Sequence, residues 1–266
     1  MTTHKHNGLH IVEHENNGPP LIFVHAFPLC HRMWDKQVEY FKNRYRVILF
    51  DTRGLGYSTE LDSWQYMMEN LSDDLISVMD FLKIDKANIC GLSMGGYITL
   101  RALTRNPERF ISVVLADTRA ERDDDKGLLG RANMFNEVRE KGIDNLIKEF
   151  PKKLLGSESY KNDELRSFVE EMISWQSPEG ICGALIAMAT RTTTLDDLKQ
   201  INIPVQIIVG SDDELTPLPF SERMQESITN SYLNIILDAG HLTNMEKPDE
   251  FNSIIENFLT TKSKRS

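Results

Sequence analysis

The sequence is poor in cysteine and positive charge, and it has no long apolar run. Its three cysteines are odd in number and form no Cys-x-x-Cys pair, so neither a disulfide framework nor a redox motif is indicated. No apolar run approaches the length needed to cross a bilayer, and no secretory signal is visible. The net charge of −10 argues against nucleic acids and anionic membranes as partners. We therefore expect a reduced, cytoplasmic protein.

Two short positive runs stand at the ends of the chain, HKH at residues 4–6 and KSKRS at residues 262–266. Both are short enough that we expect them to be solvated tails. The length of 266 residues and the hydrophobic content of 40% suit one large domain, or a core with an inserted subdomain. A chain of this size can bury a substantial core without disulfides.

Strand-like and helix-like segments alternate over most of the chain. Patterns typical of strands occur at 9–15, 20–27, 46–54, 87–90, 111–117, 204–210 and 232–240. Helical spacing occurs between them, at 33–44, 72–84, 94–106, 219–228 and 247–259, with Trp34, Val38 and Phe41 on one apolar stripe. This order predicts an α/β fold with a mostly parallel, doubly wound sheet and helices on both faces.

The alternation stops near Thr118, and only helical patterns follow until about residue 198. We therefore predict an α/β core from residues 1–118 and 199–266, interrupted by a helical lid at 119–198. Open α/β sheets bind ligands at the carboxyl ends of their strands, and the chain leaves the sheet at such an end. A lid over a site is thus favoured over plain helical packing.

Two serines precede helical patterns in positions typical of N-caps. Ser72 stands before a segment with acids in its first turn, and Ser177 is followed by Pro178. We expect both hydroxyls to cap the helices that follow them.

The segment CGLSMGG at 90–96 places a serine between two glycines, where a predicted strand meets a predicted helix. It matches G-x-S-x-G, a pattern whose meaning depends on this context. A sharp turn there would strain the backbone of Ser93, and Gly91 and Gly95 would remove side chains that clash with neighbouring chain. The N–H groups at the helix start favour negative charge beside the serine. Ser93 is therefore a candidate nucleophile, and Cys90 is expected in the core.

A serine hydroxyl needs a base to remove its proton. Among seven histidines, His241 directly follows the last predicted strand and should lie at the same sheet edge as Ser93. The base in turn needs an acid to orient it. The loop at 210–217 offers three acids, and Asp117 at the end of an earlier strand is a rival.

Six segments in this order resemble the α/β-hydrolase superfamily over nearly the whole chain: HAFPL, DTRGLGYS, GLSMGG, LADTRAERDD, GSDDELTP and GHLTNMEKP. Within it, the chain resembles small bacterial carboxylesterases, 3-oxoadipate enol-lactonases and cofactor-free perhydrolases. The resemblance implies Asp213 as the acid, and the backbone N–H groups of Phe27 and Met94 as the oxyanion hole. Ala26 stands where glycine is usual and disfavours a positive φ, so a slightly different loop path is expected there. Asp51 and Arg53 in DTRG are expected to form a structural charged pair.

The implied reaction is two-step hydrolysis of small to medium carboxylic esters through an acyl-enzyme, with no cofactor and no metal. Three reactions with the same triad stay open: enol-lactone hydrolysis of the 3-oxoadipate type, C–C bond hydrolysis and perhydrolysis. A ligand-binding receptor on this fold is the non-enzymatic alternative. The expected partners are a small ester or lactone and water, with no nucleic acid and no membrane, for a monomer or homodimer.

Substrate contacts are expected from the lid. An enol-lactonase needs a cation for its substrate's carboxylate, and Arg119, Arg131 and Arg191 are candidates, with lid anchoring as their alternative role. The candidate lining residues of an acyl pocket are Met134, Phe135, Trp175, Ile186, Met188 and Arg131. The helical spacing of the apolar residues among them fits plain packing within the lid equally well.

Overall fold

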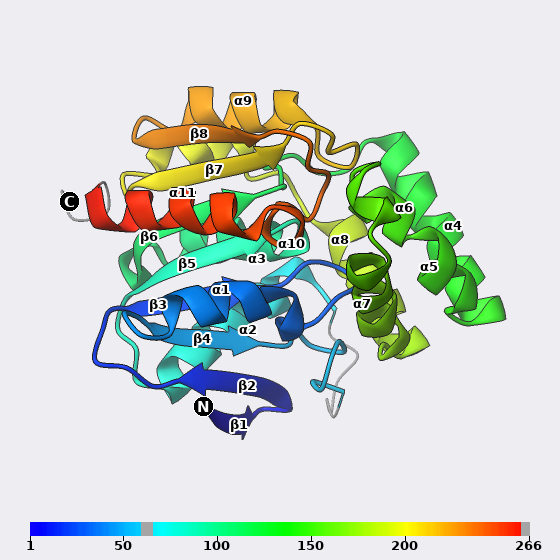
Figure 1. Ribbon diagram of the computed structural model, residues 1–266, viewed down its shortest axis with the longest axis horizontal. Coiled ribbons are helices and arrows are strands. Elements are labelled where there is room, and N and C mark those ends of the chain that lie inside the picture. The colour runs from blue at the N-terminus through cyan, green and yellow to red at the C-terminus, as the bar shows by residue number, and fades with distance from the viewer. Residues whose placement is uncertain (60–65, 262–266) are drawn as a thin grey trace.

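The computed structural model describes residues 1–59 and 66–261, and one sheet runs through the described chain (Figure 1). Its strands are β1 (Thr2–His6), β2 (Leu9–His14), β3 (Pro20–Val24), β4 (Arg46–Phe50), β5 (Ala87–Leu92), β6 (Phe110–Ala116), β7 (Val205–Gly210) and β8 (Ser231–Ile236). Their spatial order is β1-β2-β4-β3-β5-β6-β7-β8. β2 pairs antiparallel with both β1 and β4, and the remaining neighbours are parallel. The predicted mostly parallel sheet is confirmed.

Helices cover both faces of the sheet. They are α1 (Asp35–Phe41), α2 (Met68–Phe81), α3 (Met94–Arg105), α9 (Leu218–Ser227) and α11 (Pro248–Thr261), with the short α10 (Thr243–Glu246) before the last. Figure 1 shows α1 and α11 on one face, with α2 and α3 on the other. Short 3₁₀ turns are η1 (His31–Trp34), η2 (Pro107–Arg109), η3 (Ser159–Lys161) and η4 (Leu195–Gln200). This is the doubly wound arrangement that the alternating pattern predicted.

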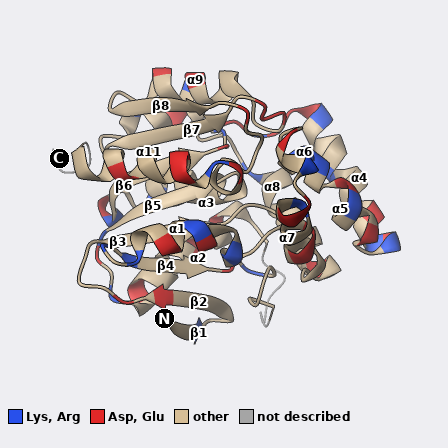
Figure 2. Cartoon of the chain, viewed as in Figure 1, with Lys and Arg blue, Asp and Glu red and all other residues tan. Residues whose placement is uncertain are grey.

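The core lies on both sides of the central strands. β5 and β7 are buried along their whole length, as expected for continuous apolar strands between two helical layers. The predicted stripe of Trp34, Val38 and Phe41 is buried, and the Trp34 ring lies 4.8 Å from that of Phe23. β5, β6 and β7 carry no charged residue, and Figure 2 places charge mainly on helices, loops and outer strands.

One of the two predicted N-caps is wrong. α2 begins at Met68, so Ser72 lies inside the helix, where it is buried and its hydroxyl donates to the carbonyl of Glu69. The helix starts earlier because Met68 and Leu71 extend the apolar stripe that packs on the core. Ser177 is confirmed as a cap, since its hydroxyl accepts a hydrogen bond from the backbone N–H of Gly180 at 3.0 Å.

The run HKH is not a solvated tail. Residues 4–6 belong to β1, which pairs with β2 and alternates between exposed and half-buried side chains. The ring of His6 stacks on Phe81 at 4.6 Å, and His4 contacts Glu13. Pairing with β2 gives the backbone N–H and C=O groups of this segment hydrogen-bond partners. This stabilisation holds the segment in the sheet despite its charged side chain. The run KSKRS lies outside the described residues.

The residues predicted as a lid form five helices between β6 and β7. These are α4 (Asp125–Lys141), α5 (Asp144–Glu149), α6 (Pro151–Leu154), α7 (Asp163–Ser174) and α8 (Pro178–Thr190). Figure 1 shows them gathered beside the ends at which the parallel strands finish. None of the helices in the described ranges is both long and apolar enough to span a membrane.

Candidate active site

Ser93 occupies a sharp turn between β5 and α3. Its φ of 55° lies in the left-handed region, which is strained for a residue with a side chain. A Cβ on Gly95 would lie 2.1 Å from the carbonyl oxygen of Val24, and one on Gly91 would lie 2.3 Å from that of Gly95. The prediction that both glycines leave space for neighbouring chain is therefore confirmed. Cys90 is fully buried, as expected.

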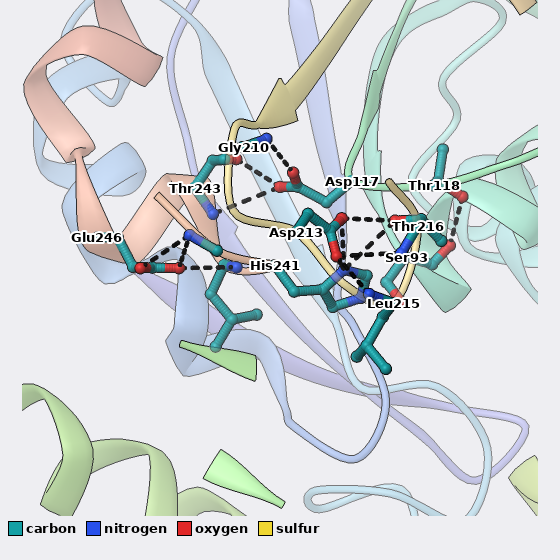
Figure 3. Close-up of polar contacts among 12 residues, drawn as sticks. Ser93, Asp117, Thr118, Gly210, Asp213, Leu215, Thr216, His241, Thr243 and Glu246 are labelled. Carbon is teal, nitrogen blue, oxygen red and sulfur yellow. Dashed lines mark hydrogen bonds and ion pairs between the residues drawn. The ribbon is translucent and has the colours of Figure 1, made fainter. Parts of the chain in front are cut away.

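Three side chains from separate strand ends meet at this turn (Figure 3). The Oγ of Ser93 lies 2.7 Å from Nε2 of His241. The Nδ1 of His241 lies 2.9 Å from both carboxylate oxygens of Asp213. All three residues are nearly or fully buried. The structure thus brings together the serine, histidine and aspartate that the sequence singled out.

Asp213 is held by its own loop. The hydroxyl of Thr216 donates to its Oδ2 at 2.6 Å, and the backbone N–H groups of Leu215 and Thr216 donate to its Oδ1. Burial would raise the pKa of Asp213, but His241 and these hydrogen bonds outweigh burial and lower it. The carboxylate is therefore ionised at neutral pH. The role of Thr216 was missed, although the threonine of GSDDELTP marks its position.

Asp117, the rival acid, makes no contact with His241 in the described structure. Its carboxylate accepts hydrogen bonds from the backbone N–H of Gly210 at 2.9 Å and from the hydroxyl of Thr243 (Figure 3). Burial, together with the nearby charge of Asp213, raises the pKa of Asp117 well above its usual value. Asp117 thus joins the loop that follows β7 to the loop that carries His241.

Two further side chains that sequence reasoning missed hold the same loops. Thr118 donates its hydroxyl to the carbonyl oxygen of Ser93 at 2.8 Å. Glu246 accepts hydrogen bonds from the backbone N–H groups of Gly240 at 3.0 Å and Gly156 at 2.9 Å. Glu246 stands in GHLTNMEKP, but its spacing alone does not reveal which backbone groups it reaches.

Phe27, one of the two residues expected to form the oxyanion hole, lines the same cavity as Ser93, and Met94 directly follows Ser93 in the chain. Phe27 lies in the loop after β3, and Met94 is the first residue of α3. Within the described residues, neither N–H has a hydrogen-bond partner. Ala26 lies in the same loop as Phe27, where the sequence predicted a slightly different backbone path. The φ of Ala26 is not positive, and the N–H of Ala26 donates to the sulfur of Met33 at 3.2 Å.

A cavity of about 430 Å³ opens onto Ser93 and His241. Of the predicted lining residues, Met134, Met188 and Arg131 line it, and sequence reasoning missed Tyr97, Phe150 and Leu185, which also do.

The other predicted lining residues lie elsewhere. Phe135 and Ile186 border a separate hollow between α4 and α8, because residues one or two positions from Met134 and Met188 project from a different side of the helix. Trp175 faces Tyr57 at 6.0 Å between ring centroids and lies outside the cavity.

The three candidate arginines share one acid, Asp123. Arg119, Arg131 and Arg191 all donate to its buried carboxylate. Burial opposes ionisation, but Arg191 and Arg131 hold the pKa of Asp123 far below its usual value. Arg191 is buried and lies over the ring of Tyr97 at 4.1 Å, so it anchors the end of α8 as the alternative reading expected. Arg119 and Arg131 also line the cavity.

The expected pair between Asp51 and Arg53 is not formed. Arg53 pairs with Asp74 of α2 at 2.6 Å, and Asp51 accepts hydrogen bonds from His31. The two side chains point to different partners, because Asp51 is fully buried whereas Arg53 reaches α2.

Comparison with known proteins identifies the family of this chain. The sequence pattern of the family described as alpha/beta hydrolase fold matches residues 19–248, so the chain belongs to that family and is a hydrolase of that fold. The chain is 32% identical to 3-oxoadipate enol-lactonase 1 of Acinetobacter baylyi, over 91% of this chain and 89% of that one.

The solved structures similar to this one include an esterase and an enol-lactonase. The malate-bound thermophilic esterase from Thermogutta terrifontis matches with a TM-score of 0.88 and 31% identity, covering 95% of this chain and 93% of its own. The enol-lactonase from Burkholderia xenovorans also gives a TM-score of 0.88, at 24% identity and over 97% and 100% of the two chains. The resemblance that the six motifs suggested is confirmed at the level of family and fold.

Proposed function

We propose that this protein hydrolyses small to medium carboxylic esters through an acyl-enzyme formed on Ser93. The observation that carries the proposal is the chain of contacts from Ser93 Oγ to His241 Nε2 at 2.7 Å, and from His241 Nδ1 to Asp213 at 2.9 Å. A serine, a histidine and an ionised aspartate in this order form a nucleophile, a base and the acid that orients it.

The first step is attack of Ser93 Oγ on the ester carbonyl while His241 takes the hydroxyl proton at Nε2. Asp213 accepts the Nδ1 proton of His241, which keeps Nε2 free and stabilises the imidazolium. His241 then protonates the leaving alcohol. In the second step His241 deprotonates a water molecule, which attacks the acyl group and releases Ser93.

The developing oxyanion is assigned to the N–H groups of Phe27 and Met94. Both are without a partner in the described chain, and Met94 lies at the start of α3, where the helix dipole favours negative charge. A donor of this kind contributes about 2.7–4 kcal/mol to stabilisation of the transition state.

The proposal includes a cap domain at 119–198 over a core of 1–118 and 199–266. It is supported by residues of α4, α6 and α8 or their flanks, such as Met134, Lys153 and Met188, which line the same cavity as Ser93. Such a cap limits the size of the acyl group that fits the cavity and keeps most bulk water out of it. We also infer a reducing, cytoplasmic location from the three free cysteines.

One experiment tests the proposed reaction directly. Purified protein should hydrolyse short p-nitrophenyl esters, and a fluorophosphonate should label it at a single peptide that contains Ser93. A panel of esters of rising acyl length, with lactones added, would define the preferred substrate. If the short esters stay intact and Ser93 is not labelled, the hydrolytic proposal fails and a ligand-binding receptor on this fold is favoured instead.

Enol-lactone hydrolysis is a second candidate, favoured by the charges of the cavity. Four cationic residues line it against three acids, in a chain whose net charge is −10. The cationic residues are Arg119, Lys126, Arg131 and Lys153, and the acids are Asp123, Asp124 and Glu214. A substrate that carries a carboxylate, as an enol-lactone of the 3-oxoadipate type does, would find complementary charge there.

Lys153→Met is expected to separate the two candidates. If a carboxylate is recognised, kcat/KM for a monomethyl dicarboxylate should fall about 2- to 5-fold, the size of an exposed ion pair, while that for the dimethyl ester stays unchanged. Lys152→Met is the matched control, because Lys152 pairs with Glu149 and does not line the cavity. Equal effects on both esters would argue against carboxylate recognition.

A further inference from the structure

Three potential metal ligands that do not line the cavity gather where β4 ends beside β2. His10 belongs to β2, Asp51 directly follows β4, and His31 opens η1. The pairing of β2 with β4 places the first two side by side, since the N–H of Asp51 donates to the carbonyl of His10 at 3.0 Å. One ligand atom from each residue lies within 4.8 Å of the others.

The spacing of these groups suits one ion. The ring centroids of His10 and His31 lie 5.3 Å apart. Two imidazoles bound to a tetrahedral zinc at ordinary Zn–N lengths would have centroids about 5 Å apart. Nδ1 of His31 lies 2.9 Å from Oδ1 of Asp51, and adjacent ligand atoms on such an ion lie about 3.3 Å apart. The three ligand atoms lie within 4.8 Å of one another, so they would have to approach by at most about 1.5 Å to reach that spacing.

The surroundings hold the ligands and leave access to them. In the described chain, the ring of His10 has no hydrogen-bond partner. The other oxygen of Asp51 accepts the N–H of Tyr57 at 2.9 Å, an outer contact that fixes a ligating carboxylate. His10 and His31 are partly exposed, and the half-exposed ring of Tyr57 lies 5.0 Å from His10. Three protein ligands leave the fourth position to water.

We propose that His10, His31 and Asp51 form a binding site for a divalent transition-metal ion, zinc above all. Two imidazoles and one carboxylate suit Zn²⁺, Co²⁺ or Ni²⁺, whereas Mg²⁺ and Ca²⁺ prefer oxygen ligands alone. The ion replaces the direct contact between His31 Nδ1 and Asp51 Oδ1. It joins β2 to the loops that follow β3 and β4, and it stabilises the fold without entering the reaction at Ser93.

The test uses untagged, EDTA-treated full-length protein titrated with ZnCl₂ and, separately, with CoCl₂. One equivalent of metal should bind, and Co²⁺ should develop the visible absorption typical of four-coordinate sites. At a hundredfold excess over Kd, zinc should raise Tm by about 5 °C. His10→Ala should abolish all three effects while keeping the Tm of the metal-free protein, because the His10 ring makes no hydrogen bond in the described structure.

His14→Ala is the matched control, since His14 lies in the same strand outside the cluster and its loss should leave metal binding intact. Stoichiometric binding that survives His10→Ala would place the metal elsewhere and overturn the proposal, as would the absence of binding to the unmodified chain. Ester hydrolysis is measured in parallel. It should be the same with and without EDTA, so failure of the metal site is distinguishable from failure of the proposed reaction.

Discussion

Ser93→Ala is expected to lower kcat for short p-nitrophenyl esters by about 10⁶-fold, the loss typical of a removed serine nucleophile. Without Oγ no acyl-enzyme forms, and the remaining rate comes only from the oxyanion donors and substrate binding. The substitution removes only the Oγ atom and keeps Cβ, so it adds no strain to the turn. The variant should therefore keep its Tm within a few degrees. Steady-state kinetics and fluorophosphonate labelling measure the two effects together.

Ser221→Ala is the matched control for this variant. Ser221 is also buried, and its hydroxyl has no hydrogen-bond partner in the described structure, so its removal should change neither kcat nor labelling. Full activity in Ser93→Ala would reject Ser93 as the nucleophile and leave the fold unaffected. Activity that disappears in both variants would point to loss of structure instead.

Asp213→Asn is expected to lower kcat by about 10⁴-fold, because an amide stabilises the wrong tautomer of the histidine. Asn keeps the size of the side chain and one oxygen for the N–H groups of Leu215 and Thr216. The positions of the three side chains should therefore be kept, while His241 carries its proton on the wrong ring nitrogen. The measurement is kcat across pH, together with the melting temperature.

Asp117→Asn gives the contrast that assigns the acid. Asp117 bonds to Gly210 and Thr243 rather than to His241, so its replacement should affect Tm more than kcat. A larger fall in kcat for Asp117→Asn than for Asp213→Asn would show that the acid had been misassigned. Comparable falls at unchanged Tm would mean that the two buried carboxylates act on His241 together.

The sequence predicted those features that depend on chain order and local backbone chemistry. Gly91 and Gly95 mark a crowded turn whatever packs around it, and parallel strands bring Ser93, Asp213 and His241 to one edge of the sheet. Family and fold followed from these segments and are confirmed by the comparisons.

Features set by tertiary partners could not be predicted in this way. Met134 lines the cavity and Phe135 does not, because only the packing of α4 against α8 decides which side faces inward. Asp51 and Arg53 look like a pair in the sequence, yet Arg53 finds its partner on α2, 21 positions away. Ser72 has the chemistry of a cap, but the apolar stripe of α2 extends past it and makes it an interior residue.

Leu154 and Gly156 tie α6 to the loop that carries His241. The backbone N–H of His241 donates to the carbonyl of Leu154 at 2.9 Å, and Glu246 binds the N–H of Gly156 as well as that of Gly240. A motion that carried α6 outward with its neighbours would break these bonds and displace the histidine. We therefore expect α6 to stay in place beside the histidine.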